Sequence, residues 1–273
     1  MIYSILLTSM LLLQPLALES PVAIAPRHGG IYVVAHRGVH SGIPENTLAA
    51  FRKAIEVGAD FVEIDVRETK DKQLVSVHNH EVDAYTKDAV GAVQNYTLAE
   101  LKAMDIGGRV GEEWKEERIP TLEEILELCH DKIGIYLDFK YADMEDVVAL
   151  IRKYDMTDKV IWYVGGLYLR QLIKHCPECV PMPDPGAERN LQRILDTVKP
   201  KIVASTWRHI SESFVKTCHD AGALVIVDDG GPETWDSLLA WGVDGIQSDD
   251  VEALIEHLRE YKQGDASVES DTD

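Results

Sequence analysis

Short β-branched runs alternate with helical patterns through most of this chain, and that alternation limits the fold more than any other feature of the sequence. Strands separated by helices form parallel sheets with the helices packed outside. Eight such strands suit an α/β fold, the (β/α)₈ TIM barrel, which takes about 250 residues. The predicted strands are Tyr32–Ala35, Phe61–Val66, Ile133–Phe139, Val160–Val164, Cys179–Met182, Lys201–Ser205, Leu224–Val227 and Gly245–Gln247, with helices such as Thr47–Val57, Met144–Tyr154 and Trp235–Ala240 between them.

One further run, Leu74–His78, does not fit the alternation. Only a few residues separate it from Phe61–Val66, too few for a parallel crossover. A hairpin that turns near Lys70–Lys72 fits instead and brings His78 back toward Glu63. We therefore expect a short β-hairpin extension above the barrel, at the end where barrel enzymes keep their chemistry.

The segment 81–120 lacks a strong strand signal, and we interpret it as a small insertion over the barrel mouth with one short helix, Leu98–Met104. The barrel domain is predicted to span 30–262. The acidic tail 263–273 has no apolar pattern and is predicted to be disordered.

Residues 1–25 are predicted to be a signal peptide and leader. Ile2–Leu18 is nearly all apolar, but Gln14 and Pro15 make it a poor membrane span. A cleaved export signal is favoured, which predicts a periplasmic or secreted protein with no stable membrane span after processing. Anchoring to a membrane by the uncleaved segment is the alternative.

The formal net charge of −20 disfavours binding to nucleic acid or to anionic membranes. A phosphate site in such a chain needs local cations. Cys176 and Cys179 have the C-x-x-C spacing of redox and zinc sites, but nothing in the sequence completes a zinc site. Packed thiols, or a local disulfide formed after export, are the favoured interpretations.

Two carboxylates stand two residues apart on one predicted strand, Glu63 and Asp65. Side chains at that spacing share a face, so both point into the barrel mouth. Burying two like charges is unfavourable without a cation, and oxygen ligands favour Mg²⁺ or Ca²⁺ over zinc. Asp138 and Lys140 repeat the spacing on the next strand, as a third carboxylate and a phosphate-binding cation. The alternative is an acidic pair facing solvent on an edge strand.

His36 and Arg37 end the first strand. Arginine suits phosphate binding, and histidine titrates near neutrality. With His78 across the mouth, His36 forms a candidate acid–base pair. Pro44–Thr47 is interpreted as the start of a helix, with Asn46 or Thr47 as its cap. The pair His78 and His80 raises a rival, a metal hydrolase of the amidohydrolase type, although the pair is misplaced for that class.

At these residues the chain resembles the glycerophosphodiester phosphodiesterase family. The resemblance rests on motifs that span nearly the whole chain in the family's order: His36–Gly38, Pro44–Thr47, Glu63–Asp65, Thr69–Asp71, His78, Leu98–Gly107, Ile119–Leu126, Asp138/Lys140 and Gly242–Asp250. It implies a barrel phosphodiesterase that uses one divalent cation, Mg²⁺ or Ca²⁺, with Mn²⁺ as a further option, to split glycerophosphodiesters into glycerol 3-phosphate and an alcohol. It assigns catalysis to His36 and His78, metal binding to Glu63, Asp65 and Asp138, and phosphate binding to Arg37 and Lys140.

The chain departs from the family pattern in three places. Asn79 follows His78 where the family usually has aspartate, and Asp138 stands where it usually has glutamate. The strand that often ends in Trp-Thr reads Val225–Asp229, so the usual aromatic wall is missing, and Trp207 is the candidate to replace it. These departures keep two alternatives open: a lysophospholipase D-like or sphingomyelinase D-like enzyme that could form a cyclic phosphate, and a catalytically inactive binding barrel.

Overall fold

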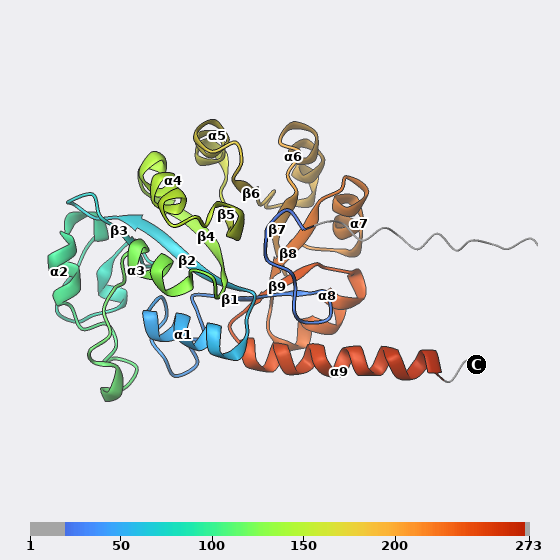
Figure 1. Ribbon diagram of the computed structural model, residues 1–273, viewed down its shortest axis with the longest axis horizontal. Helices are drawn as coiled ribbons and strands as arrows, with labels where there is room; N and C mark the ends of the chain where they lie inside the picture. Colours follow the sequence, from blue (N-terminus) through green and yellow to red (C-terminus); the bar gives the residue numbers. More distant parts are fainter. Residues whose placement is uncertain (1–19, 271–273) are drawn as a thin grey trace, which may run out of the picture.

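The strands form a TIM barrel, as predicted. The computed structural model describes residues 20–270, with side chains for residues 20–262. Within this part of the chain, parallel strands follow the order β6-β5-β4-β2-β1-β9-β8-β7 (Figure 1). The Ala204 N–H of β7 donates to the Pro183 carbonyl, just after β6, over 3.1 Å. The barrel strands are β1 Tyr32–Ala35, β2 Phe61–Glu68, β4 Gly134–Tyr141, β5 Val160–Tyr163, β6 Val180–Met182, β7 Ile202–Thr206, β8 Leu224–Asp228 and β9 Gly245–Ser248.

Helices surround the strands, and their beginnings follow from local sequence. Thr47 caps the first helix by accepting a hydrogen bond from the Ala50 N–H, and Gly58 ends it in the left-handed conformation. Thr121 caps the helix before β4 with a complete capping box. The helices are α1 Leu48–Val57, α2 Leu98–Ala103, α3 Leu122–Cys129, α4 Met144–Lys153, α5 Gly166–His175, α6 Leu191–Thr197, α7 Glu212–Asp220, α8 Trp235–Trp241 and α9 Val251–Ser270.

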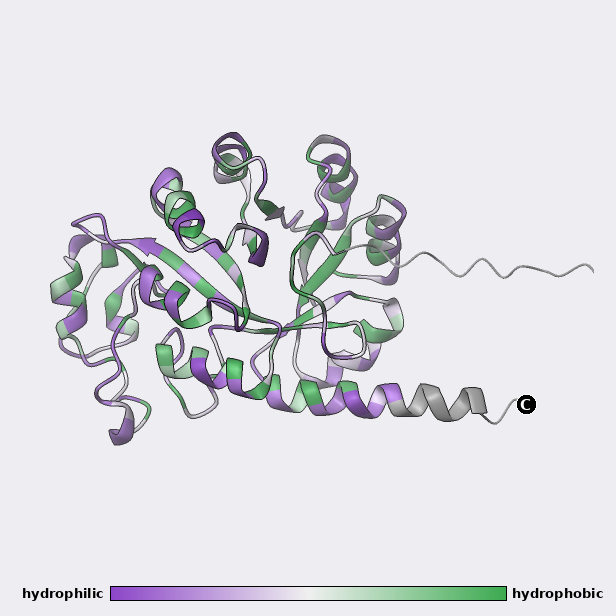
Figure 2. Ribbon diagram, viewed as in Figure 1, coloured by the Kyte–Doolittle hydropathy of each residue, from purple (hydrophilic) through white to green (hydrophobic). Residues whose placement is uncertain are grey.

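Alternation along each strand divides the core into two layers. Inward-facing residues such as Tyr32, Phe61 and Ile226 fill the barrel interior. Outward-facing residues such as Ile64 and Val225 pack against the helices. Figure 2 shows the hydrophobic residues concentrated along β7 and β8, while the outer turns of the helices around them are largely hydrophilic. Polar side chains that include Asp138, Asp228 and Gln247 follow the apolar interior layer toward the carboxyl ends of the strands, at the barrel mouth.

The predicted hairpin is present. β3, Leu74–Ser76, pairs antiparallel with β2 off the path of the barrel strands. We had expected the insertion to lie over the mouth. It lies beside β3, at one side of the mouth (Figure 1). The reason is that it packs a hydrophobic cluster of its own against the hairpin, with Val75, Tyr85 and Leu101 among its members.

Both ends of the domain differ from expectation. Residues 1–19 of the expected leader lie outside the described residues, but Val22 is buried against the barrel floor, and the Tyr32 hydroxyl lies 2.7 Å from the Ile24 carbonyl oxygen. The barrel domain therefore begins before residue 30. At the other end α9 continues to Ser270. Most of the predicted tail thus continues this helix, and its disorder in solution stays a prediction.

In the part of the chain that the structure describes, no helix is long and apolar enough to cross a membrane. Cys176 and Cys179 form a disulfide, one of the interpretations favoured for the C-x-x-C spacing.

Gly38 allows the loop after β1 to pass close to α1, and this contact predicts a stability effect. Gly38 and Gly58 both have positive φ angles, 81° and 84°, but a Cβ on Gly38 would lie 2.8 Å from the Ala50 carbonyl carbon, whereas one on Gly58 would meet no atom within 4 Å. Gly58→Ala should lower the free energy of unfolding by about 1 kcal/mol, and Gly38→Ala by about 3 kcal/mol or more. Denaturant titration measures both. Equal losses would show that the Ala50 contact has no effect.

Candidate active site

Three carboxylates meet at the mouth because of the register between two strands. Asp65 of β2 lies directly opposite Asp138 of β4, and Glu63 lies two residues before Asp65 on the same face. The three side chains offer oxygen atoms within 4.8 Å of one another. Glu63 and Asp65 are almost completely buried, at 2% and 0% exposure. The structure thus brings together all three predicted metal ligands.

The electrostatics of this cluster favour a bound cation. Burial, reinforced by the charges of Asp65 and Asp138, raises the pKa of the Glu63 carboxyl well above its usual range. Burial also raises the pKa of Asp138, against the opposing charge of Lys140. The Lys140 ammonium lies 2.5 Å from Asp138 Oδ2 and 3.1 Å from Asp65 Oδ1, yet Asp65 Oδ1 receives no aligned hydrogen bond from the residues that the structure describes. An all-oxygen set with an unsatisfied buried atom fits Mg²⁺ or Ca²⁺.

Asn46 orients one of these carboxylates, a role that sequence reasoning missed. Its Nδ2 donates to Asp65 Oδ2 over 2.7 Å, and its Oδ1 accepts from the Ser76 hydroxyl over 2.6 Å. It is 2% exposed and has a positive φ of 53°. The sequence suggested a helix cap at Asn46 or Thr47, and Thr47 fills that position. The sequence does contain a signal that could have pointed to this role. Asn46 stands directly before the helix cap, and asparagine tolerates the left-handed region of backbone conformation.

Each histidine has an oxygen partner on Nδ1. His36 Nδ1 lies 2.7 Å from Asp249 Oδ1, and His78 Nδ1 lies 2.8 Å from Asn79 Oδ1. The family usually has aspartate at position 79, so the group that orients the His78 ring was in question. The Asn79 side-chain oxygen takes that position. These contacts leave Nε2 of both rings for proton transfer. Asp249 was not predicted as a site residue, because its partner is more than 200 positions earlier in the chain.

The loop that carries His78 is fixed from two sides. The Arg67 guanidinium donates to the His78 carbonyl over 2.7 Å, and the Tyr85 hydroxyl accepts from the Asn79 N–H over 2.8 Å. His80 is exposed, and it does not line the cavity that contains the carboxylates. Among the described residues, the metal-binding group contains carboxylates alone, so the rival that uses His78 and His80 as metal ligands finds no support.

The two predicted phosphate-binding cations flank the carboxylates. The Arg37 backbone N–H donates to Glu63 Oε2 over 2.7 Å, and its guanidinium lies 3.3 Å from Glu45. Arg37 Nε is buried without a hydrogen-bond partner among the described residues. Lys140 stands on the opposite side, against Asp65 and Asp138. A phosphate between them would meet positive charge from both sides.

A cavity of about 190 Å³ joins these groups. It is lined by six of the predicted site residues, namely His36, Arg37, Glu63, Asp65, His78 and Asp138. Lys140 lines a neighbouring open hollow together with His78. Sequence reasoning missed Tyr136, which lies beside Glu63 on β4. It also missed the rest of the cavity wall, to which Tyr163, Thr206, Asp228 and Gln247 contribute, because β5, β7, β8 and β9 showed no paired charges to mark them.

Trp207 is the one predicted site residue that the structure places elsewhere. It stacks on Trp241 of α8, with ring centroids 5.5 Å apart and planes 12° from parallel, and it does not line the cavity. The chain turns immediately after β7 and directs the indole toward the helix layer. The aromatic wall expected from Trp207 is therefore absent from this cavity.

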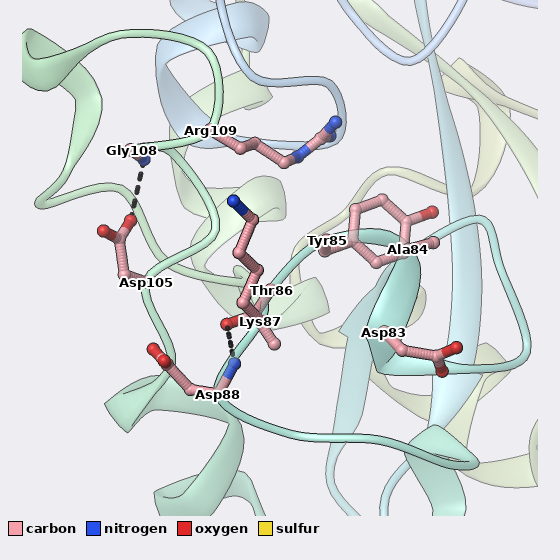
Figure 3. Close-up of a pocket in the computed structure, with 9 residues that line it drawn as sticks. All are labelled: Asp83, Ala84, Tyr85, Thr86, Lys87, Asp88, Asp105, Gly108 and Arg109. Atoms are coloured by element: carbon pink, nitrogen blue, oxygen red, sulfur yellow. Dashed lines mark hydrogen bonds between the residues drawn. The ribbon is translucent and has the colours of Figure 1, made fainter.

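The insertion has a second, more open pocket, lined by residues 83–88 and by Asp105, Gly108 and Arg109 (Figure 3). In Figure 3 the Arg109 side chain extends toward the Tyr85 ring, and its guanidinium lies 5.4 Å from the ring centroid. The Asp105 carboxylate accepts from the Gly108 N–H over 2.8 Å and shapes the loop. Tyr85 thus contacts both this pocket and the His78 loop.

Comparisons with known proteins agree with this geometry. The model of the "Glycerophosphoryl diester phosphodiesterase family" matches residues 36–166. A glycerophosphodiester phosphodiesterase from Caldanaerobacter subterraneus is 34% identical over 247 residues, which cover 83% of this chain and 97% of that protein.

Solved structures agree as well. A phosphodiesterase from Oleispira antarctica, in complex with the product sn-glycerol-3-phosphate, is 26% identical with a TM-score of 0.76, covering 84% of this chain and 96% of that one. A glycerophosphodiester phosphodiesterase from Agrobacterium tumefaciens is 27% identical with a TM-score of 0.74, covering 82% and 99%. This chain therefore belongs to the glycerophosphodiester phosphodiesterase family and is a phosphoric diester hydrolase.

Proposed function

We propose that this enzyme hydrolyses small glycerophosphodiesters to sn-glycerol 3-phosphate and an alcohol, with one divalent cation held by Glu63, Asp65 and Asp138. The observation that carries the proposal is the placement of two oriented histidines around one cavity that also contains the carboxylate cluster. The Oleispira relative, whose complex contains sn-glycerol-3-phosphate, supports the product.

The residues divide the chemistry between them. The cation, when bound, supplies charge neutralisation at the phosphoryl oxygens. Arg37 and Lys140 add positive charge on either side of the phosphate, where negative charge grows in the transition state. Of His36 and His78, one takes a proton from the attacking hydroxyl and the other gives a proton to the leaving oxygen.

The cavity supports a small substrate over a lysophospholipid. Its volume is about 190 Å³, and most of its lining side chains are polar or charged. An acyl chain would have to leave the mouth without an apolar groove among these lining residues. Phosphorus NMR of the product distinguishes an open monoester from a cyclic phosphate and so tests the alternative route.

Export remains part of the proposal. The Cys176–Cys179 disulfide supports it, because such bonds persist in oxidising compartments. Intact-mass measurement of the protein from its native host would show whether the N-terminal segment has been removed. A full-length chain that stays in the cytosol would contradict export.

The metal requirement tests the proposed function directly. Hydrolysis of glycerophosphocholine should stop when a chelator removes the cation, and Mg²⁺, Ca²⁺ or Mn²⁺ should restore it, because the carboxylates alone would repel the phosphate. Coupled detection of glycerol 3-phosphate measures the rate. Undiminished turnover in chelator would contradict the proposal.

The histidines give a second prediction with a matched control. His36→Ala and His78→Ala should each lower kcat roughly 10²–10⁴-fold, because each removes one proton-transfer group. His80→Ala removes an exposed imidazole two residues from His78 and should leave the rate at the wild-type level. Steady-state kinetics with saturating metal measure kcat of the three variants. An equal effect of all three substitutions would contradict the proposed acid–base pair.

Asn46 gives a third prediction, on metal affinity. Asn46→Ala frees Asp65 to rotate and should raise the metal concentration for half-maximal activity roughly 10–100-fold. Asn95→Ala, the same change at an exposed position, should leave it unaltered. Metal titrations of the two variants measure the difference. A lower melting temperature with unchanged metal dependence would show that Asn46 is purely structural.

A further inference from the structure

Two polar side chains on the far wall of the cavity have no part in the steps above. Asp228 ends β8 and lies directly opposite Gln247 of β9. Both face inward, because Ile226 and Gly245, two residues earlier on the same strands, border the barrel interior. The Gln247 Nε2 donates to Asp228 Oδ1 over 3.3 Å. The two residues therefore form one polar unit on the side of the mouth away from the metal-binding carboxylates.

Gln247 has an unsatisfied atom in this wall. Its side chain is 6% exposed, and its Oε1 is buried without a hydrogen-bond partner among the described residues. Leaving such a group unpaired costs about 1–3 kcal/mol. Arg37 Nε, Asp65 Oδ1 and Ser205 Oγ are also unsatisfied at the cavity. A phosphate would account for Arg37 and a cation for Asp65, and the Ser205 hydroxyl can act as donor or acceptor. Neither a phosphate nor a cation accounts for Gln247 Oε1, which needs a hydrogen-bond donor.

Both residues of the unit line the cavity, and the groups that they leave for a ligand are acceptors. The amide nitrogen of Gln247 is directed to Asp228, so the carbonyl oxygen is the remaining group of that side chain. The Asp228 carboxylate, when ionised, accepts and does not donate. It also repels a phosphate, so the phosphate is confined to the side of Arg37 and Lys140. A ligand that meets this wall must carry donors.

We propose that Asp228 and Gln247 form an acceptor subsite that binds hydroxyl groups of the glycerol moiety and so selects diesters with free hydroxyls. This inference rests on the proposed phosphodiesterase function and adds a specificity determinant to it. The carboxylate stands at the end of the strand where the family resemblance had led us to expect an aromatic wall. Recognition there is by hydrogen bonds to hydroxyl groups in place of apolar contact.

A series of substrates with one constant leaving group tests the subsite. The three are the 4-nitrophenyl phosphodiesters of sn-glycerol, of propane-1,2-diol and of propan-1-ol, which share a three-carbon chain and differ in the number of free hydroxyls. Wild-type kcat/KM should fall roughly tenfold or more when hydroxyls are removed, since a site built to bind a hydroxyl rejects the analogue that lacks it. Release of 4-nitrophenol measures every rate with the same readout.

Two variants locate the discrimination. Gln247→Met and Asp228→Leu each remove acceptors at similar volume and should reduce the preference for glycerol over propan-1-ol to a few-fold. Ser213→Ala, a side-chain truncation on the outer helix α7, should keep the wild-type preference. Thermal unfolding shows whether each variant is folded. If one variant does not fold, the substrate series with the wild type still tests the subsite.

The outcomes separate the two claims. Turnover of all three substrates at equal efficiency by the wild type, or full preference retained in both variants, overturns the acceptor subsite and leaves the phosphodiesterase function standing. Absence of turnover for every substrate with every cation overturns the proposed function, and the subsite falls with it. Loss of preference in both variants, with Ser213→Ala unchanged, supports the subsite.

Discussion

The mutual repulsion of three carboxylates, two of them buried and one partly buried, on β2 and β4 is the constraint around which this barrel mouth is built. Strand register places Asp65 opposite Asp138, so neither can move away from the other without breaking the ladder. Lys140 and the Arg37 N–H offset part of the repulsion. In the proposed mechanism a divalent cation would complete the compensation and attract the phosphate on which the histidines act.

The groups around the cluster hold it in place. Asn46 fixes one oxygen of Asp65 from the loop after β1 and is itself held by Ser76 of the hairpin. The same hairpin carries the chain on to His78, whose loop is fixed by Arg67 and Tyr85. The β2–β3 hairpin therefore positions both Asp65 of the carboxylate cluster and His78 of the histidine pair, while Asp138 and His36 come from other elements.

The mouth has two sides with opposite polarity. The side formed by β1, β2 and β4 carries the cations and the metal-binding carboxylates, and it suits an anion. The side formed by β8 and β9 carries Asp228 and Gln247, and it suits hydrogen-bond donors. A glycerophosphodiester has an anionic centre beside a hydroxylated arm, so the proposed subsite fits the proposed substrate in one orientation.

Much of this could be predicted from the sequence, because strong local patterns encode it. The eight strands follow from alternation with helices, and the position of His78 follows from a turn too short for a crossover. Contacts that depend on packing could not be predicted. Asn46 and Asp249 act across strands, and the direction of Trp207 is decided by the turn that follows it. The position of the Ser20–Ile24 segment likewise depends on its contacts with the floor of the assembled barrel.

The central claim is that Glu63, Asp65 and Asp138 hold one divalent cation. Anomalous diffraction from crystals grown with Mn²⁺ tests it most directly, because it locates the ion without reference to activity. The account predicts one strong anomalous peak among these three carboxylates, bordered by the cavity that His36 and His78 line. Absence of a peak there at saturating Mn²⁺, or a peak at other ligands instead, would contradict it.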